Sequence, residues 1–293
     1  MREEPAPLSL QPKLQILKLQ ARGEEPPVAV SCDAIQVYRG LETLSGAATP
    51  DERTRLEHRL VGFVDPSGEF SAGRFAALAH EEIDQLLAEG RRPIVVGGTG
   101  LYLRAALADL DLRPPVSPEI RAEVEHEVAE RGPEQLWGEL DPDVAATIHP
   151  RDRKRIARTT ELQRAGIEPP RSSEGLWTAR LRRPTLLVGL TIERDELARR
   201  IDARVEEMID AGAAEEARAA AEHGASRTAR AALGFEKLLA GDVDGVKRAH
   251  RAFARRQLTW MRKMEGVELI DRTGRDDGGV AEEIVAGLGE NGA

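Results

Sequence analysis

Two short apolar runs, residues 27–31 and 93–97, are rich in β-branched side chains and are bounded by proline or glycine. This pattern predicts two buried strands. Between them, residues 71–89 place apolar side chains three and four positions apart, which predicts an amphipathic helix with Ser71 as its N-cap. A strand, a helix and a second strand in this order predict a βαβ unit and therefore a parallel sheet.

The pattern changes after Asp111, where proline-broken helical runs follow one another with no strand between them. Residues 184–190 return to the strand pattern, and a long helix follows with apolar side chains on one face. A last short strand is predicted at residues 267–270. We therefore expect an α/β core domain of residues 1–111 and 182–293, interrupted by a helical insertion domain of residues 112–181.

The composition indicates a globular protein. The chain has 293 residues, 41% of them hydrophobic, which is enough for a sizeable core. No apolar run approaches the roughly 18 to 20 residues that span a bilayer, and the first residues lack the pattern of a secretory signal. The single cysteine, Cys32, excludes an intramolecular disulfide and is interpreted as a small buried hydrophobe. We expect a cytoplasmic protein with no membrane partner.

The net charge of −9 argues at first against a nucleic-acid partner, because phosphate backbones repel acid. The basic residues are, however, segregated. Five of them lie in residues 151–158, and six lie in residues 248–263, which contain no acidic residue. Arg151, Arg155 and Arg158 share one helix face by their spacing. These segments fit either a phosphate-facing surface or ordinary helix packing, and periodicity does not separate the two.

Two segments could carry chemistry. Gly97-Gly98-Thr99-Gly100 follows a predicted strand and opens a helix, so its backbone could approach an anion; the alternative is a tight turn that needs positive φ. Asp33 follows the other predicted strand, and could be a general base, a metal ligand or an N-cap. The carboxyl ends of parallel strands lie at one edge of a sheet, so Asp33 and Thr99 are predicted to face the same crevice.

Taken together and in order, eight segments resemble those of the tRNA dimethylallyltransferases, which transfer a five-carbon prenyl group from dimethylallyl diphosphate to N6 of the adenosine 3′ of the anticodon, giving N6-isopentenyladenosine. The resemblance covers about residues 28–265. The matching segments are DAIQVYRG (33–40), GAATPDE (46–52), FSAGRF (70–75), VGGTGLYL (96–103), IHPRDRKRIARTTEL (148–162), RIDARVEEMIDAG (200–212), ALGFEKL (232–238) and RRQLTWMRK (255–263).

The resemblance implies an α/β core like that of the P-loop nucleotide kinases, with a helical insertion that grips the anticodon stem-loop of tRNA. It implies that Asp33 is the catalytic base and that Thr99 contacts the reacting end of both substrates. It also implies Mg²⁺ as a cofactor, dimethylallyl diphosphate as a substrate and a diphosphate contact at Arg230. The residues implied to contact tRNA are Asp33, Ala34, Ile35, Gln36, Thr99, Arg121, Lys154, Arg155, Ile156, Ala157 and Arg158.

One departure from the family is large. Its members begin with a strand and a phosphate-binding loop of the form GPTxxGK[ST] roughly 20 residues before the position of Asp33, whereas residues 6–25 here read APLSLQPKLQILKLQARGEE. Lys13 lies near the right distance but has no glycines around it. Three explanations are open: a frameshift or misplaced start, a true loss that leaves a tRNA binder unable to hold diphosphate, or compensation by arginine.

The main expectation is a tRNA prenyltransferase, acting as a monomer, whose competence depends on that missing loop. An alternative of a different class is a non-catalytic tRNA-binding protein, which would bind tRNA in a salt-sensitive way and have no affinity for diphosphate. A small-molecule kinase that shares the core fold is a weaker alternative, because the nucleotide-binding loop is missing here too.

Overall fold

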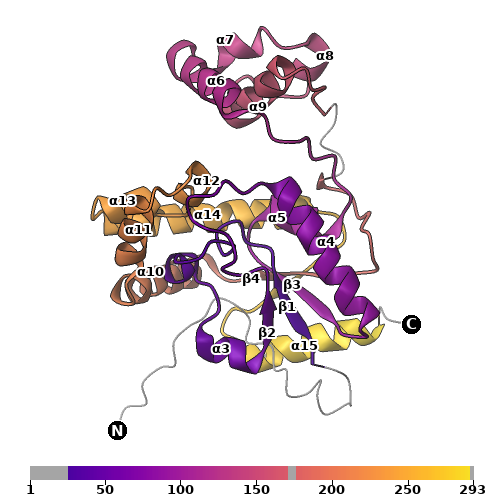
Figure 1. Cartoon of the computed structure of the whole chain (residues 1–293). Helices are drawn as coiled ribbons and strands as arrows, with labels where there is room; N and C mark the ends of the chain where they lie inside the picture. Colours follow the sequence, from indigo (N-terminus) through magenta and orange to yellow (C-terminus); the bar gives the residue numbers. More distant parts are fainter. Residues whose placement is uncertain (1–25, 171–175, 291–293) are drawn as a thin grey trace. The chain divides into compact units, whose positions relative to one another are not determined.

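The structure, a computed structural model, describes residues 26–170 and 176–290. The chain forms two compact units (Figure 1), of which one comprises Met1–Ala108 with Leu181–Ala293 and the other Asp109–Arg180. We call them the core unit and the helical unit. The departure of the family pattern at residues 6–25 lies outside the described residues. No helix in the described part of the chain combines the length and apolar character needed to cross a membrane.

The first sheet of the core unit has the strand order β2-β1-β3, and all its strands are parallel. Its strands are β1 (Val28–Ser31), β2 (Glu57–Arg59) and β3 (Pro93–Val96). Every residue of β1 is buried, and full burial of Val28 and Val30 stabilises the fold by about 1.5–3 kcal/mol each. The predicted strands at 27–31 and 93–97 are confirmed, but only the first is buried as predicted, because every residue of β3 is partly exposed. β2 was not predicted, because Glu-His-Arg has no apolar alternation.

The second sheet pairs β4 (Leu187–Thr191) with β5 (Val267–Asp271), again in parallel. Its two strands match the predicted strands at 184–190 and 267–270. A Cβ on Gly189 would lie 2.7 Å from the Leu269 side chain and 2.9 Å from Sδ of Met261, so a larger residue there would require these flexible side chains to shift. The α/β class with parallel sheets is therefore confirmed. Within the described ranges β3 and β4 each keep one edge without a strand partner, so the sheet is in two parts.

Two helices pack together beside the first sheet (Figure 1). They are α4 (Ala72–Ala88) and α5 (Gly100–Leu107). The predicted N-cap of α4 is confirmed, because Ser71 Oγ accepts a hydrogen bond of 3.2 Å from the Arg74 amide. The rings of Phe75 and Tyr102 join the two helices with centroids 4.7 Å apart. This packing fixes α5, and with it the turn that precedes α5.

The rest of the core unit is helical, and its two longest helices are α10 (Arg194–Asp210) and α14 (Val243–Lys263). Arg251 of α14 pairs with Asp202 of α10 at 3.0 Å, and Lys247 pairs with Glu206. The residue numbers rise along one helix as they fall along the other, so the two helices run antiparallel. The other helices of this unit are α2 (Glu42–Ser45), α3 (Pro50–Arg55), α11 (Ala213–Glu222), α12 (Arg227–Arg230), α13 (Phe235–Leu239) and α15 (Asp277–Glu290).

The helical unit consists of α6 (Pro118–Arg131), α7 (Pro133–Trp137), α8 (Pro142–Ala145) and α9 (Arg153–Arg164). The first three begin on proline, whose missing N–H costs nothing at the first helical position. Apolar side chains of all four helices form one core around Val124, Leu136 and Ile156, which are fully buried. The Trp137 indole N–H donates to the carbonyls of Ala145 and Ile148, at 3.1 and 2.8 Å. The unit therefore has its own core.

Candidate active site

Asp33 and Thr99 meet at the carboxyl ends of β1 and β3, as predicted. Oδ1 of Asp33 accepts hydrogen bonds from the amides of Ile35, at 2.8 Å, and Gln36, at 3.4 Å. Oδ2 accepts one of 3.4 Å from the Thr99 hydroxyl, which in turn accepts one of 3.5 Å from the Ala34 amide. The carboxylate is therefore held on both oxygens at the carboxyl ends of two adjacent strands. Its backbone bonds form an Asx turn within the loop rather than a helix N-cap.

Burial raises the pKa of Asp33 above its ordinary value, because desolvation disfavours the charged form. The hydrogen bonds from Ile35, Gln36 and Thr99 and the positive charge of Arg204 act in the opposite direction without cancelling the effect of burial. A carboxylate with a raised pKa accepts a proton more readily than an exposed one. Asp33 is thus suited to act as a general base.

The loop that carries Asp33 is fixed by Gln36. Its side-chain oxygen accepts a hydrogen bond of 2.8 Å from the Ser31 hydroxyl, and its side-chain nitrogen donates one of 3.2 Å to the carbonyl of Gly46. Cys32, beside Asp33, is fully buried, and burial raises the pKa of its thiol well above the ordinary range. The interpretation of Cys32 as a small buried hydrophobe is confirmed.

The glycines around Thr99 serve close packing and not an unusual backbone angle. None of Gly97, Gly98 and Gly100 has a positive φ, so the tight-turn alternative is wrong. A Cβ on Gly98 would overlap with the side-chain amide of Gln257, which donates a hydrogen bond of 3.1 Å to the Gly98 carbonyl. A Cβ on Gly100 would lie 2.5 Å from Cδ2 of Trp260. The RRQLTW segment of α14 therefore packs on this turn.

Arg204 of α10 is a candidate site residue that the sequence analysis missed. Its guanidinium fills the space beside Gly46: a Cβ there would lie 3.0 Å from Cζ of Arg204 and overlap with Nη2. Gly46 has φ +62, which independently favours glycine. The charge of Arg204 partly opposes the rise in the pKa of Asp33 that burial causes. No carboxylate of the described residues lies within ion-pair distance of Arg204, so its charge remains available to an anion.

Arg230 was expected to bind diphosphate, but the structure gives it a carboxylate partner. Its Nε and Nη2 donate to the two oxygens of Glu236 at 2.9 and 3.1 Å, and its guanidinium lies 5.2 Å from the centre of the Phe235 ring. The two side chains are 37% and 59% exposed, so this is a surface ion pair, worth about 0–1 kcal/mol. The sequence analysis placed Arg230 just before the ALGFEKL segment but did not predict its ion pair with Glu236 of that segment.

The predicted tRNA-contacting residues of α9 divide by burial. Lys154 and Arg155 are exposed, whereas Ile156 is fully buried in the core of the helical unit and Ala157 packs against it. Arg158 donates to Glu161 at 3.0 Å and to the carbonyl of Pro114 at 2.6 Å, so it ties α9 to the segment before α6. The helix begins at the predicted place, where the Asp152 side chain accepts a hydrogen bond from the Arg155 amide.

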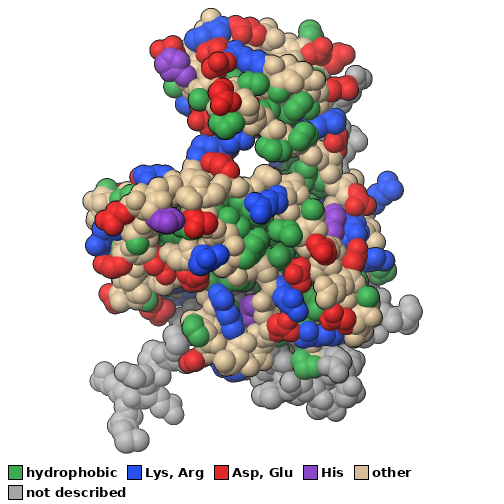
Figure 2. Space-filling view, in the orientation of Figure 1, with side chains coloured by type: hydrophobic (Ala, Val, Ile, Leu, Met, Phe, Trp, Pro, Cys, Tyr) green, Lys and Arg blue, Asp and Glu red, His purple; other side chains and the backbone are tan. Residues whose placement is uncertain are grey.

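Arg121, the remaining predicted contact, is half-buried on α6, which packs against α9. On the face drawn in Figure 2, Lys and Arg side chains of the helical unit are interspersed with Asp and Glu side chains. On that face the helical unit therefore has isolated Lys and Arg side chains rather than a continuous basic surface.

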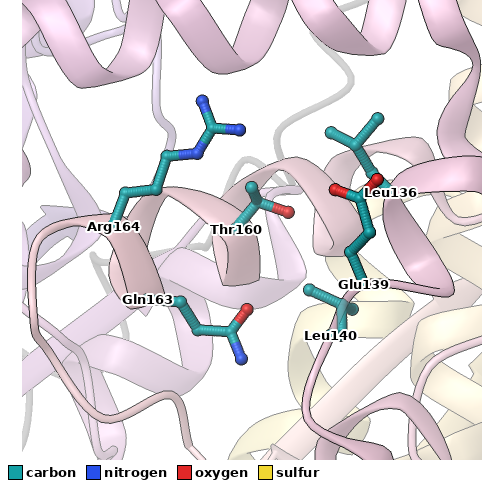
Figure 3. A pocket seen from close by; sticks show the side chains of 6 residues that line it. All are labelled: Leu136, Glu139, Leu140, Thr160, Gln163 and Arg164. Carbon is teal, nitrogen blue, oxygen red and sulfur yellow. The ribbon is translucent and has the colours of Figure 1, made fainter.

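The helical unit also has a shallow hollow of about 260 Å³, shown in Figure 3. One wall is a face of α9, and the other is α7 with the turn that follows it. None of its lining residues belongs to the Asp33 cluster, so the hollow is not the candidate active site. The lining residues are Leu136, Glu139, Leu140, Thr160, Gln163 and Arg164.

A buried carboxylate with a raised pKa, held by a hydroxyl and subject to the charge of an arginine, is the kind of arrangement found in active sites of α/β enzymes. The family model for IPP transferases matches residues 36–264. A tRNA dimethylallyltransferase of Anaeromyxobacter dehalogenans is 40% identical over 254 residues, covering 82% of this chain and 85% of that protein. The chain therefore belongs to the IPP transferase family.

Solved structures agree with this assignment. The full-length tRNA isopentenylpyrophosphate transferase of Bacillus halodurans has a TM-score of 0.66 and 29% identity, covering 96% of this chain and 94% of that one. A eukaryotic dimethylallyltransferase acting on tRNA has a TM-score of 0.73 and 23% identity, covering 94% of this chain and 75% of that one; it supports the fold alone.

Proposed function

We propose that this chain transfers the dimethylallyl group of dimethylallyl diphosphate to N6 of the adenosine 3′ of a tRNA anticodon. The observation that carries the proposal is the Asp33–Thr99 pair at the carboxyl ends of β1 and β3, with a raised pKa at Asp33. Family membership supports the reaction class, since the relatives are named tRNA dimethylallyltransferases.

Asp33 acts on the nucleophile. The lone pair of the adenine amino group is delocalised into the ring, so N6 attacks carbon poorly until a proton is removed. N6 forms a bond to the first carbon of the dimethylallyl group, the bond from that carbon to the diphosphate oxygen breaks, and one N6 proton passes to Asp33. The amides of Ile35 and Gln36 and the hydroxyl of Thr99 keep the carboxylate in place while it accepts this proton.

Arg204 acts on the leaving group. Diphosphate departs with growing negative charge, and a preorganised cation in a partly buried site stabilises that charge more than water does. Arg204 is half-buried, and its charge lowers the pKa of Asp33, so it serves the same site. Arg230 is less suited to this role because Glu236 already binds it.

The family resemblance implies Mg²⁺ as a cofactor, and the proposal here is that the diphosphate, rather than a cluster of protein side chains, holds it. The described residues contain no group of three or more His, Cys, Asp or Glu side chains that could hold a metal ion. In sites that handle phosphates, Mg²⁺ keeps few protein ligands and binds mainly phosphate oxygens and water. We therefore assign Mg²⁺ to the diphosphate, and the proton transfer above uses only groups of this chain.

The test is to incubate the full chain with dimethylallyl diphosphate, Mg²⁺ and a tRNA that has adenosine 3′ of its anticodon. The tRNA is then digested and analysed by mass spectrometry for a nucleoside heavier by one dimethylallyl group. A second version carries a strand and a GPTxxGK[ST] loop in front of residue 26. Product from either version supports the proposal, and product from the second alone assigns the deficit to the missing loop.

Absence of product from both versions overturns the proposal. If both nevertheless bind tRNA in a salt-sensitive way, the non-catalytic tRNA-binding protein becomes the better account. The missing phosphate-binding loop is the observation that favours this second candidate. A small-molecule kinase would instead consume ATP in the absence of tRNA.

A further inference from the structure

The short helix α2 is capped from a distant part of the chain. Its N-cap residue is Leu41, whose apolar side chain cannot accept a hydrogen bond. The carboxylate of Glu216, on α11, takes that place. Its two oxygens accept hydrogen bonds of 2.9 Å from the Thr43 amide and 2.8 Å from the Leu44 amide. These are the second and third amides of α2, the ones that an ordinary N-cap side chain binds, and a carboxylate also suits the positive end of a helix.

The bonds to Glu216 continue through α2 to Gly46, the residue that ends this helix. The peptide group between Thr43 and Leu44 donates its N–H to Glu216, and its carbonyl accepts a hydrogen bond of 3.1 Å from the Gly46 amide. Gly46 has the left-handed backbone conformation of a helix C-cap, with φ 62 and ψ 40. The peptide group that Glu216 holds therefore also holds Gly46.

Gly46 contacts two groups of the proposed active site. Its carbonyl accepts a hydrogen bond of 3.2 Å from the Gln36 side chain, and the Gln36 amide donates one of 3.4 Å to Oδ1 of Asp33. Gly46 also lies against the guanidinium of Arg204, which a Cβ at this position would overlap. A shift of α2 would therefore change the surroundings of both the base and the arginine.

We propose that Glu216 is a positioning residue for Asp33. By capping α2 it holds Gly46, and the Gly46 carbonyl holds the Gln36 side chain in the loop that carries the base. This inference rests on the proposed function for its effect on the reaction, whereas the cap itself is independent of that function. Glu216 acts through α2 and the Gln36 loop.

The first measurement needs no ligand. Amide hydrogen exchange of the full chain is followed by NMR, and we expect the Thr43 and Leu44 amides to exchange about tenfold faster or more in Glu216→Ala, because the cap that protects them is gone. The side-chain ¹⁵N–¹H signals of Gln36 are assigned by their loss in Gln36→Met. In Glu216→Ala these signals shift, because the bond from Gln36 to Gly46 loosens.

Glu215→Ala is the matched control. Glu215 precedes Glu216 in the first turn of α11, but its side chain is 65% exposed and pairs with Arg218 at 2.7 Å. The control removes the same charge from the same turn, and it leaves the exchange rates and the Gln36 signals unchanged. Glu216→Gln keeps one of the two acceptor oxygens, so we expect a smaller increase in exchange than in Glu216→Ala.

The second measurement separates turnover from binding. Prenyl transfer is measured in the version of the chain that forms product, below the temperature at which each variant begins to unfold. In Glu216→Ala we expect kcat to fall about tenfold or more, with the KM for tRNA within about threefold of the wild type, because a misplaced base slows proton transfer without removing a tRNA contact.

A double-mutant cycle shows whether Glu216 acts through Gln36. In the Gln36→Met background the bond to Gly46 is already absent, so Glu216→Ala should lower kcat by less than about threefold further. A cap that served stability alone would lower kcat by the same factor in both backgrounds.

Wild-type exchange of the Thr43 and Leu44 amides in Glu216→Ala overturns the proposal. So do effects of Glu216→Ala and Gln36→Met on kcat that simply multiply. If Glu216→Ala does not fold, Glu216→Gln replaces it, and wild-type exchange and kcat in that variant overturn the proposal. If no version forms prenylated tRNA, the proposed function fails, while the exchange rates and the Gln36 signals still decide whether Glu216 holds this part of the fold. The two failures are therefore distinguishable.

Discussion

Replacing Gly100 by alanine tests how tightly α14 sets the position of Thr99. The new Cβ lies 2.5 Å from Cδ2 of Trp260 and closer still to Cε3, while ordinary contact begins at 3.4 Å, so the turn and the indole must separate by more than about 0.9 Å. The indole ring is rigid, so either α14 or the turn moves. Misplacing a catalytic group by about 1 Å costs on the order of 100-fold in rate. We therefore expect kcat/KM to fall about 100-fold.

The effect on stability is smaller. Overpacking costs about 1–3 kcal/mol, and replacing glycine by alanine inside a helix returns about 1 kcal/mol, so the free energy of unfolding falls by about 0–2 kcal/mol in urea titrations. Gly138→Ala is the matched control, because its Cβ meets nothing closer than 3.4 Å. Gly100→Ala combined with Trp260→Leu should recover activity. Full activity in Gly100→Ala alone would refute the claim that α14 sets the position of Thr99.

The remaining predictions concern the helical unit, the two arginines and pH. Ile156→Ala lowers the free energy of unfolding by about 2–5 kcal/mol, whereas Arg155→Ala changes it by less than about 0.5 kcal/mol and weakens tRNA binding measured by filter retention; equal effects on stability would contradict the assignment of Ile156 to the core. Arg204→Gln lowers kcat/KM by about tenfold or more and Arg230→Gln by less than about threefold; the reverse order would restore Arg230 as the diphosphate contact. Because the pKa of Asp33 is raised, kcat/KM should fall on acidification at a higher pH than an exposed carboxylate would give, and a limb at about pH 3.9 would contradict this.

The strands and the Asp33–Thr99 pair were predictable because they depend on local pattern and on one general rule. β-branched runs bounded by glycine or proline identify buried strands, and parallel strands place their carboxyl ends at one edge. β2 was missed because its three residues are polar. The division of the sheet into two parts was missed because strand order depends on contacts between distant segments.

The roles of the arginines were not predictable from spacing. Arg204 lies in a helix that also carries many acidic residues and Arg230 lies just before the ALGFEKL segment. Only the fold shows that Glu236 binds Arg230, while the Arg204 guanidinium lies against Gly46 and its charge acts on Asp33. Ile156 was grouped with its basic neighbours because the resemblance covers a contiguous segment, although its apolar side chain lies in the core. The burial of each side chain distinguishes core residues from surface residues in such a segment, and a single sequence does not show that burial.

Substitution of Asp33 by asparagine has a stability consequence that is opposite to its effect on activity. A carboxyl group with a raised pKa contributes stability below its unfolded pKa of about 3.9, and this is lost as the pH rises through the folded value. The ionised form therefore lowers the stability of the protein at pH 7. Asp33→Asn should raise the melting temperature at pH 7, and the difference should disappear near pH 3.

The most direct test of the central claim is prenyl transfer by Asp33→Asn beside the parent chain, both preceded by the same strand and phosphate-binding loop. The asparagine keeps the size of the side chain but cannot accept the N6 proton. We predict a prenylated adenosine in tRNA treated with the parent and a rate lower by about 100-fold or more with Asp33→Asn, at equal tRNA affinity. Product formed at the same rate by both proteins would contradict the assignment of Asp33 as the base.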